Sequence, residues 1–314
     1  MRKKISILLV VIVLLTCTGC GNSKYITDSN KQMVKNTETG QTLRNDILCR
    51  PTDKELLKIY KKNEKQMRNK LDKLPECNSF KLSSVKYHSL WESIFVKPLA
   101  WVILKLGALV KNYGLSIIII TILIRLIMYP ITKKSAMQSE NLKKAQNDLQ
   151  KLEKKYAGKQ DQESMMQKSQ EMMLIYKKYN INPMSGCIFA LIQIPLFFAF
   201  YEAMNRLPAI FEGKFLGFHL GTTPINAMQS GNFFYIIFIV LVVLTTYFSF
   251  KLNSGATPSP EQEKQMKMMS KIMVIMIGIT SITMPVAIEV YWIFNSGFTI
   301  IQNLLVKRKK ANVK

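Results

Sequence analysis

The stretch Ile117–Met128 reads IIIITILIRLIM, and it decides the fold class. One charged residue, Arg125, has apolar neighbours on both sides, and Tyr129-Pro130 follows the stretch directly. A run this apolar is typical of a helix that enters a lipid bilayer, and a proline is typical of a position near a helix end. We therefore predict a first membrane span from about Gly114 to Met128.

Four further apolar runs predict four more spans. They cover residues 188–203, 233–250, 272–282 and 286–306, and residues 266–271 extend the short fourth span at its inner end. The chain is therefore predicted to be an all-α polytopic membrane protein with five transmembrane helices.

The composition combines many apolar residues with a strong positive charge. Of the 314 residues, 48% are hydrophobic, and 44 Lys and Arg stand against 20 Asp and Glu, a net charge of +24. Such a charge often indicates nucleic-acid binding, but the mean hydropathy of +0.08 is high for that class. No zinc-finger, RRM or KH signature occurs either. We therefore expect no DNA partner.

The basic residues are distributed unevenly among the loops. Residues 133–179 contain 11 Lys and Arg, residues 251–271 contain four and the tail 307–314 contains five, whereas residues 205–231 contain two. Because short loops rich in Lys and Arg stay in the cytoplasm, we predict an N-terminus outside the cell and a C-terminus in the cytoplasm. The expected location is the bacterial plasma membrane, with 307–314 as a basic cytoplasmic tail.

Residues 1–20 resemble a bacterial lipoprotein signal peptide. The basic start Arg2-Lys3-Lys4 precedes an apolar stretch over residues 5–15 and then Thr18-Gly19-Cys20, an order typical of export signals. Cys20 is the predicted lipidation site, where an acylated (palmitate-carrying) cysteine becomes the mature N-terminus. The alternative is a signal anchor that stays uncleaved.

Residues 21–93 are predicted to form an extracytoplasmic N-terminal segment. Thr52-Asp53-Lys54-Glu55 matches a capping box that starts a helix, which we expect to end near Pro75. The lysines of this helix contact anionic lipid headgroups or simply face water. Its apolar positions fall on one side: Leu56, Tyr60, Met67, Leu71 and Leu74.

Cys49 and Cys77 lie in the same exported segment. Sequence leaves two alternatives, a disulfide and two free thiols, because spacing alone does not fix their geometry.

Residues 94–111 are mostly apolar but contain Lys97, Pro98 and Lys105. We interpret them as an amphipathic helix along the outer membrane interface, a position that suits the nearby Trp91 and Trp101. The five-span core then covers residues 112–306.

Between the first two spans, residues 133–180 are predicted to form a cytoplasmic helical hairpin with its turn at residues 158–161. Apolar stripes at three- and four-residue steps would pack the two arms antiparallel. Met166 and Met173 offer a pliable surface to a passing segment or merely fill gaps. The stripes comprise Leu142, Ala145, Leu149, Leu152 and Tyr156 in the first arm and Met165, Ser169, Met172, Tyr176 and Tyr179 in the second.

Arg125 is the most informative residue. It lies roughly 16 Å along the first span, where a charge costs about 2.5 to 3.5 kcal/mol even on a lenient scale. Its side chain either snorkels to the inner headgroups or faces a hydrated cavity. Glu202 and Glu289 lie too close to the outer end to reach it, so we predict no direct carboxylate partner for Arg125 at rest.

Polar residues at helical steps in the other spans favour the hydrated cavity. The polar stripe of an apolar helix faces protein or water rather than lipid. The alternative is that each polar residue simply forms a hydrogen bond to a neighbouring helix. The predicted substrate groove comprises Arg125, Thr121, Gln193, Thr245, Thr246, Ser249, Trp292, Asn295, Ser296 and Thr299, and Gln302 and Asn303 continue the last stripe.

Several segments resemble the YidC-type membrane protein insertases of the Oxa family, in the Gram-positive form with five spans and a lipoprotein signal. The resemblance covers about residues 85–306 and leaves residues 21–80 outside. It rests on segments that occur in order: LIRLIMYP at 123–130, YKKYNINP at 176–183, QIP at 193–195, YWIFN at 291–295 and IIQ at 300–302.

The resemblance implies an insertase and chaperone with a hydrophilic groove, open to the cytoplasm and the lipid, whose conserved arginine is Arg125 and whose aromatic residue is Trp292. Its expected partners are nascent membrane proteins and membrane lipids, with the Sec translocon and the ribosome as further candidates. We expect no cofactor, no metal and no catalytic residue.

Two other classes of function compete with the insertase. A small transporter or channel with an arginine-lined cavity is the main alternative, but we see no convincing inverted repeat. An intramembrane peptidase needs a paired catalytic constellation, whereas His88 and His219 fall outside the predicted spans and no HExxH motif occurs.

Overall fold

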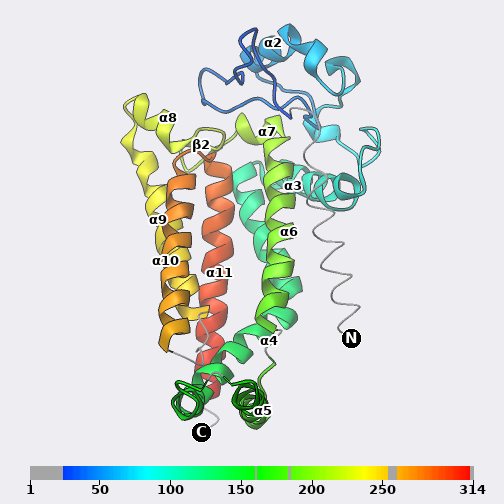
Figure 1. Cartoon of the computed structure of the whole chain (residues 1–314). Coiled ribbons are helices and arrows are strands. Elements are labelled where there is room, and N and C mark those ends of the chain that lie inside the picture. Colours follow the sequence, from blue (N-terminus) through cyan, green and yellow to red (C-terminus); the bar gives the residue numbers. More distant parts are fainter. Residues whose placement is uncertain (1–23, 160, 183–184, 254–259, 312–314) are drawn as a thin grey trace. The chain divides into compact units, whose positions relative to one another are not determined.

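The computed structural model describes residues 24–159, 161–182, 185–253 and 260–311, and they are mostly helical (Figure 1). The chain divides into two compact units. The first unit combines the chain up to Tyr113 with Ala199–Thr222, and the second combines Gly114–Phe198 with the chain from Thr223 onward. The predicted signal peptide and its Cys20 lie outside the described residues.

The first unit contains a short helix, α2 (Lys54–Lys62). The helix starts where the sequence predicts, but its cap is Asp53 rather than Thr52. The Asp53 carboxylate accepts a hydrogen bond from the Leu56 N–H at 2.7 Å, which satisfies one of the N–H groups that a helix start leaves unpaired.

The predicted continuation of this helix to Pro75 is wrong. Asn63 ends α2, because its side chain and backbone N–H both donate to the carbonyl of Ile59, at 2.9 and 3.2 Å. Three single 3₁₀ turns follow, at Glu64–Gln66, Leu71–Lys73 and Cys77–Ser79. Four of the five predicted apolar positions are nevertheless buried, and Met67 is half-buried.

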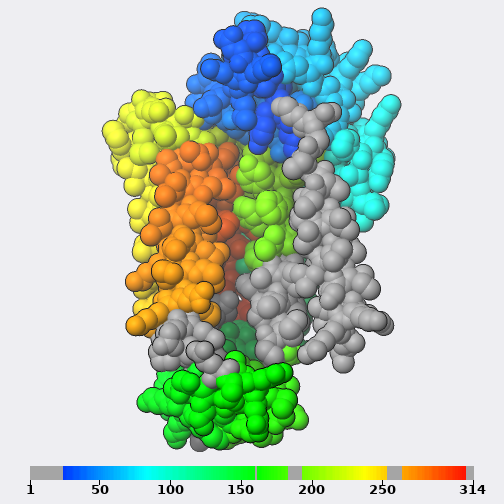
Figure 2. All heavy atoms as spheres, viewed as in Figure 1, coloured from blue at the N-terminus to red at the C-terminus, as the bar shows by residue number. Residues whose placement is uncertain are grey.

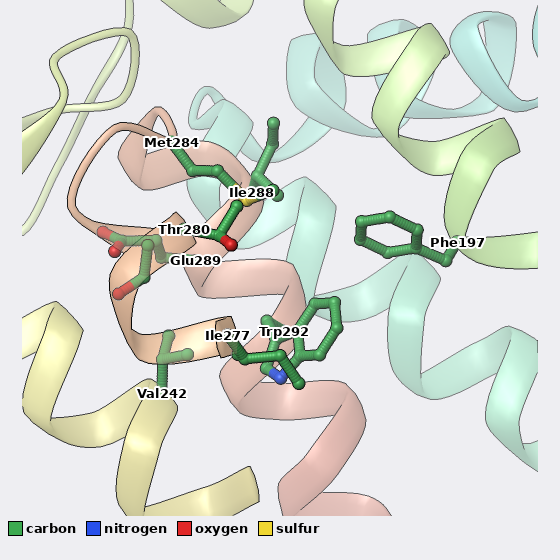
Figure 3. A pocket seen from close by; sticks show the side chains of 9 residues that line it. Phe197, Val242, Ile277, Thr280, Met284, Ile288, Glu289 and Trp292 are labelled. Carbon is green, nitrogen blue, oxygen red and sulfur yellow. The ribbon is translucent and has the colours of Figure 1, made fainter. Parts of the chain in front are cut away.

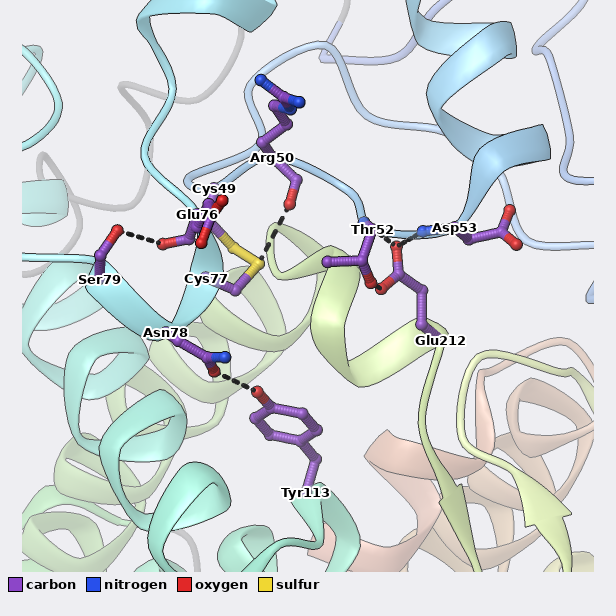
Figure 4. Close-up of a disulfide and its surroundings, with 10 residues drawn as sticks. All are labelled: Cys49, Arg50, Thr52, Asp53, Glu76, Cys77, Asn78, Ser79, Tyr113 and Glu212. Atoms are coloured by element: carbon purple, nitrogen blue, oxygen red, sulfur yellow. Dashed lines mark hydrogen bonds between the residues drawn. A yellow bond between two sulfur atoms is a disulfide. The ribbon is translucent and has the colours of Figure 1, made fainter.

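Cys49 and Cys77 form a disulfide (Figure 4), which decides between the two alternatives that the sequence left open. Close by, Glu212 accepts hydrogen bonds from the N–H groups of Thr52 and Asp53 at 2.8 and 3.0 Å, and it also binds the Thr52 hydroxyl. These contacts join three distant parts of the sequence into one small folded body.

A buried cluster of charges also holds the first unit together. Asp46 accepts two hydrogen bonds from Arg44, at 2.7 and 2.8 Å, and lies 3.4 Å from Arg206. Arg206 in turn pairs with Glu92 at 3.0 Å, as does Arg68. Burial acts to raise the pKa of Asp46, but the hydrogen bond from Arg44 and the surrounding arginine charges outweigh it and hold that pKa at about 2.

A long helical stretch and a small hairpin complete the first unit. The π-helical turn Glu92–Val96 runs directly into α3 (Lys97–Val110). Lys97 is buried and its ammonium donates to the backbone carbonyls of Val85 and Lys86, both at 2.9 Å. The remaining elements are α7 (Pro208–Phe211), β1 (Lys214–Phe215) and β2 (Phe218–His219), and the two strands pair antiparallel.

The second unit begins with α4 (Tyr113–Lys155), one continuous helix of 43 residues. It contains both the predicted first span and the first arm of the predicted hairpin, so the expected break at Tyr129-Pro130 is wrong. An internal proline removes one helical hydrogen bond. The buried stripe on the same face continues past it through Thr132 and Ala136, and this packing offsets the loss.

The end of α4 lies antiparallel to α5 (Gln162–Lys178). Three ion pairs join the two helices, with N–O distances of 2.6 to 2.7 Å. They are Lys155–Glu171, Lys168–Glu153 and Lys178–Asp148.

The predicted apolar stripe is mostly buried in the first arm of the hairpin but only partly in the second. In the first arm Ala145, Leu149, Leu152 and Tyr156 are buried. In the second arm Met165 is 52% exposed and Ser169 is also exposed. The inward face of α5 is rotated towards Lys168 and Glu171, because long charged side chains cover the partner helix with their stems.

α9 (Ile236–Asn253) packs against both α10 (Pro260–Ser281) and α11 (Val286–Ala311) (Figure 1). The turn helix α8 (Pro224–Gln229) and the 3₁₀ turn Phe233–Tyr235 precede α9. α6 (Ser185–Asn205) contains the predicted second span.

Three helical stretches in the described part of the chain are long and apolar enough to cross a membrane: Glu92–Val110, Tyr113–Lys155 and Phe233–Leu252. The last two contain predicted spans. The first includes the residues predicted to lie along the interface, and length and composition do not separate that arrangement from a span. That α6, α10 and α11 also cross the membrane stays a prediction.

α9 and α10 present a broad apolar surface to the outside of the second unit. α10 (orange) lies at the surface in the view of Figure 2. An apolar surface this wide is unfavourable in water and indicates contact with lipid or protein. Its exposed residues include Ile237, Val240 and Leu244 of α9 and Met268, Met269, Ile272, Ile275, Met276 and Ile279 of α10.

Candidate functional site

Arg125 is buried in α4 and points to α11. Its side chain is 3% exposed, and its Nε donates a hydrogen bond to Oδ1 of Asn295 at 2.7 Å. Asn295 is also buried. The predicted groove arginine is thus held by a neutral oxygen from another helix, in a segment that is mostly apolar.

A second contact joins α9 to α11. The indole N–H of Trp292 donates to the hydroxyl of Thr246 at 2.8 Å. The Trp292 ring meets Phe197 of α6 edge to face, with 5.1 Å between the ring centroids. This contact therefore brings two of the predicted groove residues together.

A third contact lies two helical turns beyond Arg125. The hydroxyl of Thr132 is 2.9 Å from Oε1 of Gln302, and both residues are buried. We call the six side chains of these three contacts the polar seam: Arg125, Asn295, Trp292, Thr246, Thr132 and Gln302.

Thr132 and Tyr291 are not among the groove residues predicted from the sequence. Thr132 follows Arg125 by seven residues, which is two helical turns and therefore the same face, but the expected break at Pro130 hid this periodicity. Tyr291 is buried and lies near the side chain of Gln193. Its position four residues before Asn295 was the signal that could have found it.

Other predicted groove residues bond within their own helices. The hydroxyls of Thr121, Thr245 and Thr299 donate to carbonyls four residues earlier, at 2.6, 2.7 and 3.1 Å. Ser249 is half-buried and Ser296 is buried. Hydroxyls bonded in this way can rotate towards a ligand only at the expense of a local hydrogen bond.

The two carboxylates weighed as partners of Arg125 have other surroundings. Glu202 forms an ion pair with Lys24 at 2.9 Å. The oxygens of Glu289 have no hydrogen-bond partner among the described residues, so Glu289 does not bind Arg125. The described residues also contain no group of three His, Cys, Asp or Glu side chains that could hold a metal ion.

The chemistry available in the polar seam is hydrogen bonding and charge pairing. A guanidinium carries five N–H donors, and in a low-dielectric setting its bonds to oxygen are stronger than in water. The seam can therefore hold a polar or negatively charged group at a depth where hydrocarbon alone would exclude it.

Comparison with known proteins identifies the family. The family model for the 60Kd inner membrane protein matches residues 105–313. Membrane protein insertase YidC of Oceanobacillus iheyensis is 34% identical over 227 residues, 70% of this chain and 84% of that protein. Membrane protein insertase MisCA of Bacillus subtilis is 38% identical over 218 residues, 69% of this chain and 79% of that protein.

One solved structure also resembles the chain. It is an active YidC insertase with its first transmembrane domain resolved, at 22% identity and a TM-score of 0.43, covering 69% of this chain and 46% of the other. The family model and the two sequence relatives each cover about two thirds of the chain or more, and from them it follows that this chain belongs to the 60Kd inner membrane protein family.

Proposed function

We propose that this chain is a membrane protein insertase that takes the polar part of a nascent membrane protein through the polar seam. The observation that carries the proposal is the buried contact between Arg125 and Asn295 in an apolar span. The family assignment supports it, since the relatives from both organisms are named membrane protein insertases.

The seam lowers the barrier that a polar tail meets in hydrocarbon. When the tail arrives, its oxygens replace Asn295 or join it at the guanidinium of Arg125. Because a hydrogen-bonded arrangement is exchanged for another one, neither the arginine nor the tail is left unsatisfied. An acidic tail adds the attraction of opposite charges, which is stronger at this depth than in water.

The apolar part of the client supplies the driving force. As the tail moves along the seam, the apolar segment leaves sideways and partitions into lipid, so no covalent bond has to be broken. The membrane potential adds about 2.3 kcal/mol per charge per 100 mV for an acidic tail that moves outward. The exposed apolar surface of α9 and α10 supports a lipid environment for the helices beside this path.

The finer topology is part of the same proposal. The chain has five spans, an N-terminus outside the cell that is lipid-anchored at Cys20, and a C-terminus in the cytoplasm. Residues 94–111 lie along the outer interface and the α4–α5 hairpin lies in the cytoplasm, where it meets the client. The disulfide in the first unit supports an exported location, because disulfides persist in oxidising compartments. The Sec translocon and the ribosome are proposed partners.

Reconstitution tests the function. Liposomes containing the full chain should insert a single-span client with an acidic N-terminal tail, and protein-free liposomes should not. Arg125→Ala should reduce insertion about tenfold or more, and Arg125→Lys should retain part of it, because the charge stays while the planar donor group is lost. Liposomes that pass a small solute but insert no client would contradict the proposal and favour a transporter or channel.

A further inference from the structure

A cavity of about 180 Å³ lies in the second unit, and neither Arg125 nor Asn295 lines it (Figure 3). Its walls come from α6, α9, α10, α11 and the turn between the last two helices. The lining residues are mostly apolar or aromatic, and one of them, Glu289, is acidic. Trp292 lines the cavity and also belongs to the polar seam.

Glu289 is the feature that the proposed insertion path does not use. Its side chain is 1% exposed, and neither carboxylate oxygen has a hydrogen-bond partner in the described part of the chain. An isolated buried carboxylate is costly, and buried charges are normally paired. A cation that enters the cavity would therefore stabilise the charged form of Glu289.

The polar groups around the cavity select the chemistry of a ligand. The hydroxyls of Thr280 and Ser281 donate to carbonyls of their own helix at 2.6 and 2.9 Å, and the indole N–H of Trp292 donates to Thr246. Their donors are thus engaged, whereas the two hydroxyl oxygens and the Glu289 carboxylate can still accept. A lining of acceptors suits a ligand that donates hydrogen bonds.

The rest of the lining favours a compact cation on an apolar stem. The rings of Phe197 and Trp292 attract a cation electrostatically. An ammonium group carries three N–H donors, which matches the carboxylate and the two hydroxyls, whereas a guanidinium requires a planar fork. The apolar walls suit the four-carbon stem of a lysine side chain.

We propose that the Glu289 cavity binds the ammonium group of a lysine side chain of an inserting client. This inference rests on the proposed insertase function and names a class of client, one with a lysine in the part that passes the cavity. Glu289 is the charge partner, and Thr280 and Ser281 are the further acceptors. The cavity is thus a second binding site, separate from the Arg125 contact. It favours a positively charged group, whereas Arg125 favours a negatively charged one.

The test compares two single-span clients that differ only by Lys or Gln at one position of the polar tail. The full chain is reconstituted in vesicles of phosphatidylglycerol and cardiolipin, whose headgroups carry no cationic group, so that a lipid headgroup cannot compete with the lysine for the cavity. The measured quantity is the ratio of the inserted fractions, Lys client over Gln client. Because the ratio is compared between protein variants, any effect of the lysine on crossing the bilayer itself cancels.

The ratio of inserted fractions, Lys client over Gln client, should be about five to ten times higher for the unchanged chain than for the Glu289→Gln variant. Glu202→Gln is the matched control, since Glu202 pairs with Lys24 and does not line the cavity, and it should leave the ratio unchanged. A ratio that is the same in the unchanged chain and in Glu289→Gln overturns the inference.

A second variant and a crosslinking experiment distinguish loss of lysine binding from misfolding of the Glu289→Gln variant. Thr280→Val removes one acceptor and should lower the same ratio by a smaller factor. Ile277 lines the cavity. In the Ile277→Cys variant the new thiol should form a disulfide with a cysteine next to the client's lysine more readily than with the same cysteine in the Gln client. Equal crosslinking contradicts the inference. If the unchanged chain inserts neither client, the proposed function itself fails.

Discussion

Arg125 is buried, yet its positive charge can still attract an acidic group. Its charge lies in an apolar helix, yet it is bound by the amide oxygen of Asn295 at 2.7 Å. An amide oxygen stabilises the guanidinium without neutralising it. The charge therefore remains able to attract an acidic group that enters the site, which a permanent carboxylate partner would prevent.

Substitutions of Asn295 should separate stability from activity. Asn295→Asp places a carboxylate beside Arg125, so the unfolding temperature in detergent should rise while insertion of an acidic-tailed client falls about tenfold. Asn295→Leu removes the acceptor and should destabilise the protein by about 1 to 3 kcal/mol. Thermal unfolding and the insertion assay measure the two effects, and Gln229→Ala, at an exposed position at the end of α8, is the control that should change neither. An Asn295→Asp variant with full insertion would show that neutralising Arg125 has no consequence.

Asp46 should make the first unit sensitive to acid. Its ordinary pKa is 3.8, and in the folded protein Arg44 and the other arginines hold it at about 2 despite burial. Since the folded pKa is the lower one, the stabilisation of about 2 kcal/mol is present above pH 3.8 and is lost as the pH falls towards 2.

The Asp46→Asn variant checks this linkage. At pH 7 it should unfold more easily by about 3 to 5 kcal/mol, because Arg44 and Arg206 lose a buried partner. Between pH 4 and about 2 its stability should change less than that of the unchanged protein. Hydrogen exchange of the first unit over this pH range measures both effects. Asp72→Asn, at an exposed position, is the control, and an equal pH slope in Asp46→Asn would contradict the linkage.

The candidate site could be predicted residue by residue only in part. Periodicity on the last helix identified Trp292 and Asn295, both of which make contacts in the polar seam. It could not show that the hydroxyl of Thr245 turns back to Leu241, because the spacing of residues fixes a helix face but not a rotamer. Nor could it show that Glu289 is deeply buried, since that depends on how α11 packs.

At the scale of elements, α4 and α5 are held together by two unequal kinds of contact. Leu149 is fully buried between them, whereas Glu171 and Lys155 form an exposed ion pair. Leu149→Ala should destabilise the hairpin by about 2 to 4 kcal/mol, and Glu171→Ala by less than about 1 kcal/mol. Hydrogen exchange of the α5 amides measures the difference. Equal protection in the two variants would mean that apolar packing does not hold the hairpin.

Sequence patterns predicted which elements exist better than where they end. Each of the five predicted spans falls within a helix of the structure, with at most three residues outside it at one end, because long apolar runs have few alternatives to a helix. The boundaries at Pro130 and Pro75 were wrong. α4 continues past Pro130 because its buried face packs on both sides of the proline. α2 ends at Asn63, well before the apolar pattern ends near Pro75.

At the scale of the whole molecule, the first unit carries long-range constraints that no periodicity reveals. The disulfide of Cys49 and Cys77 and the contacts of Glu212 with Thr52 and Asp53 link segments 28 to 160 residues apart. Closing such loops reduces the entropy of the unfolded chain. A segment that the sequence described only as exported and amphipathic is therefore a folded body, and a folded, disulfide-bonded body fits the oxidising side of the membrane.

The proposed topology predicts which side of the membrane each unit exposes. In a Cys187→Ser background, Ser79→Cys should react with a membrane-impermeant thiol reagent in intact cells, because Ser79 is an exposed residue of the first unit. Ser169→Cys, exposed on α5, should react only after the membrane is permeabilised, since the Lys- and Arg-rich hairpin is retained in the cytoplasm. Labelling of denatured protein controls for the intrinsic reactivity of each cysteine. The reverse pattern would invert the topology and would place the disulfide in the reducing cytoplasm, which disulfides seldom survive.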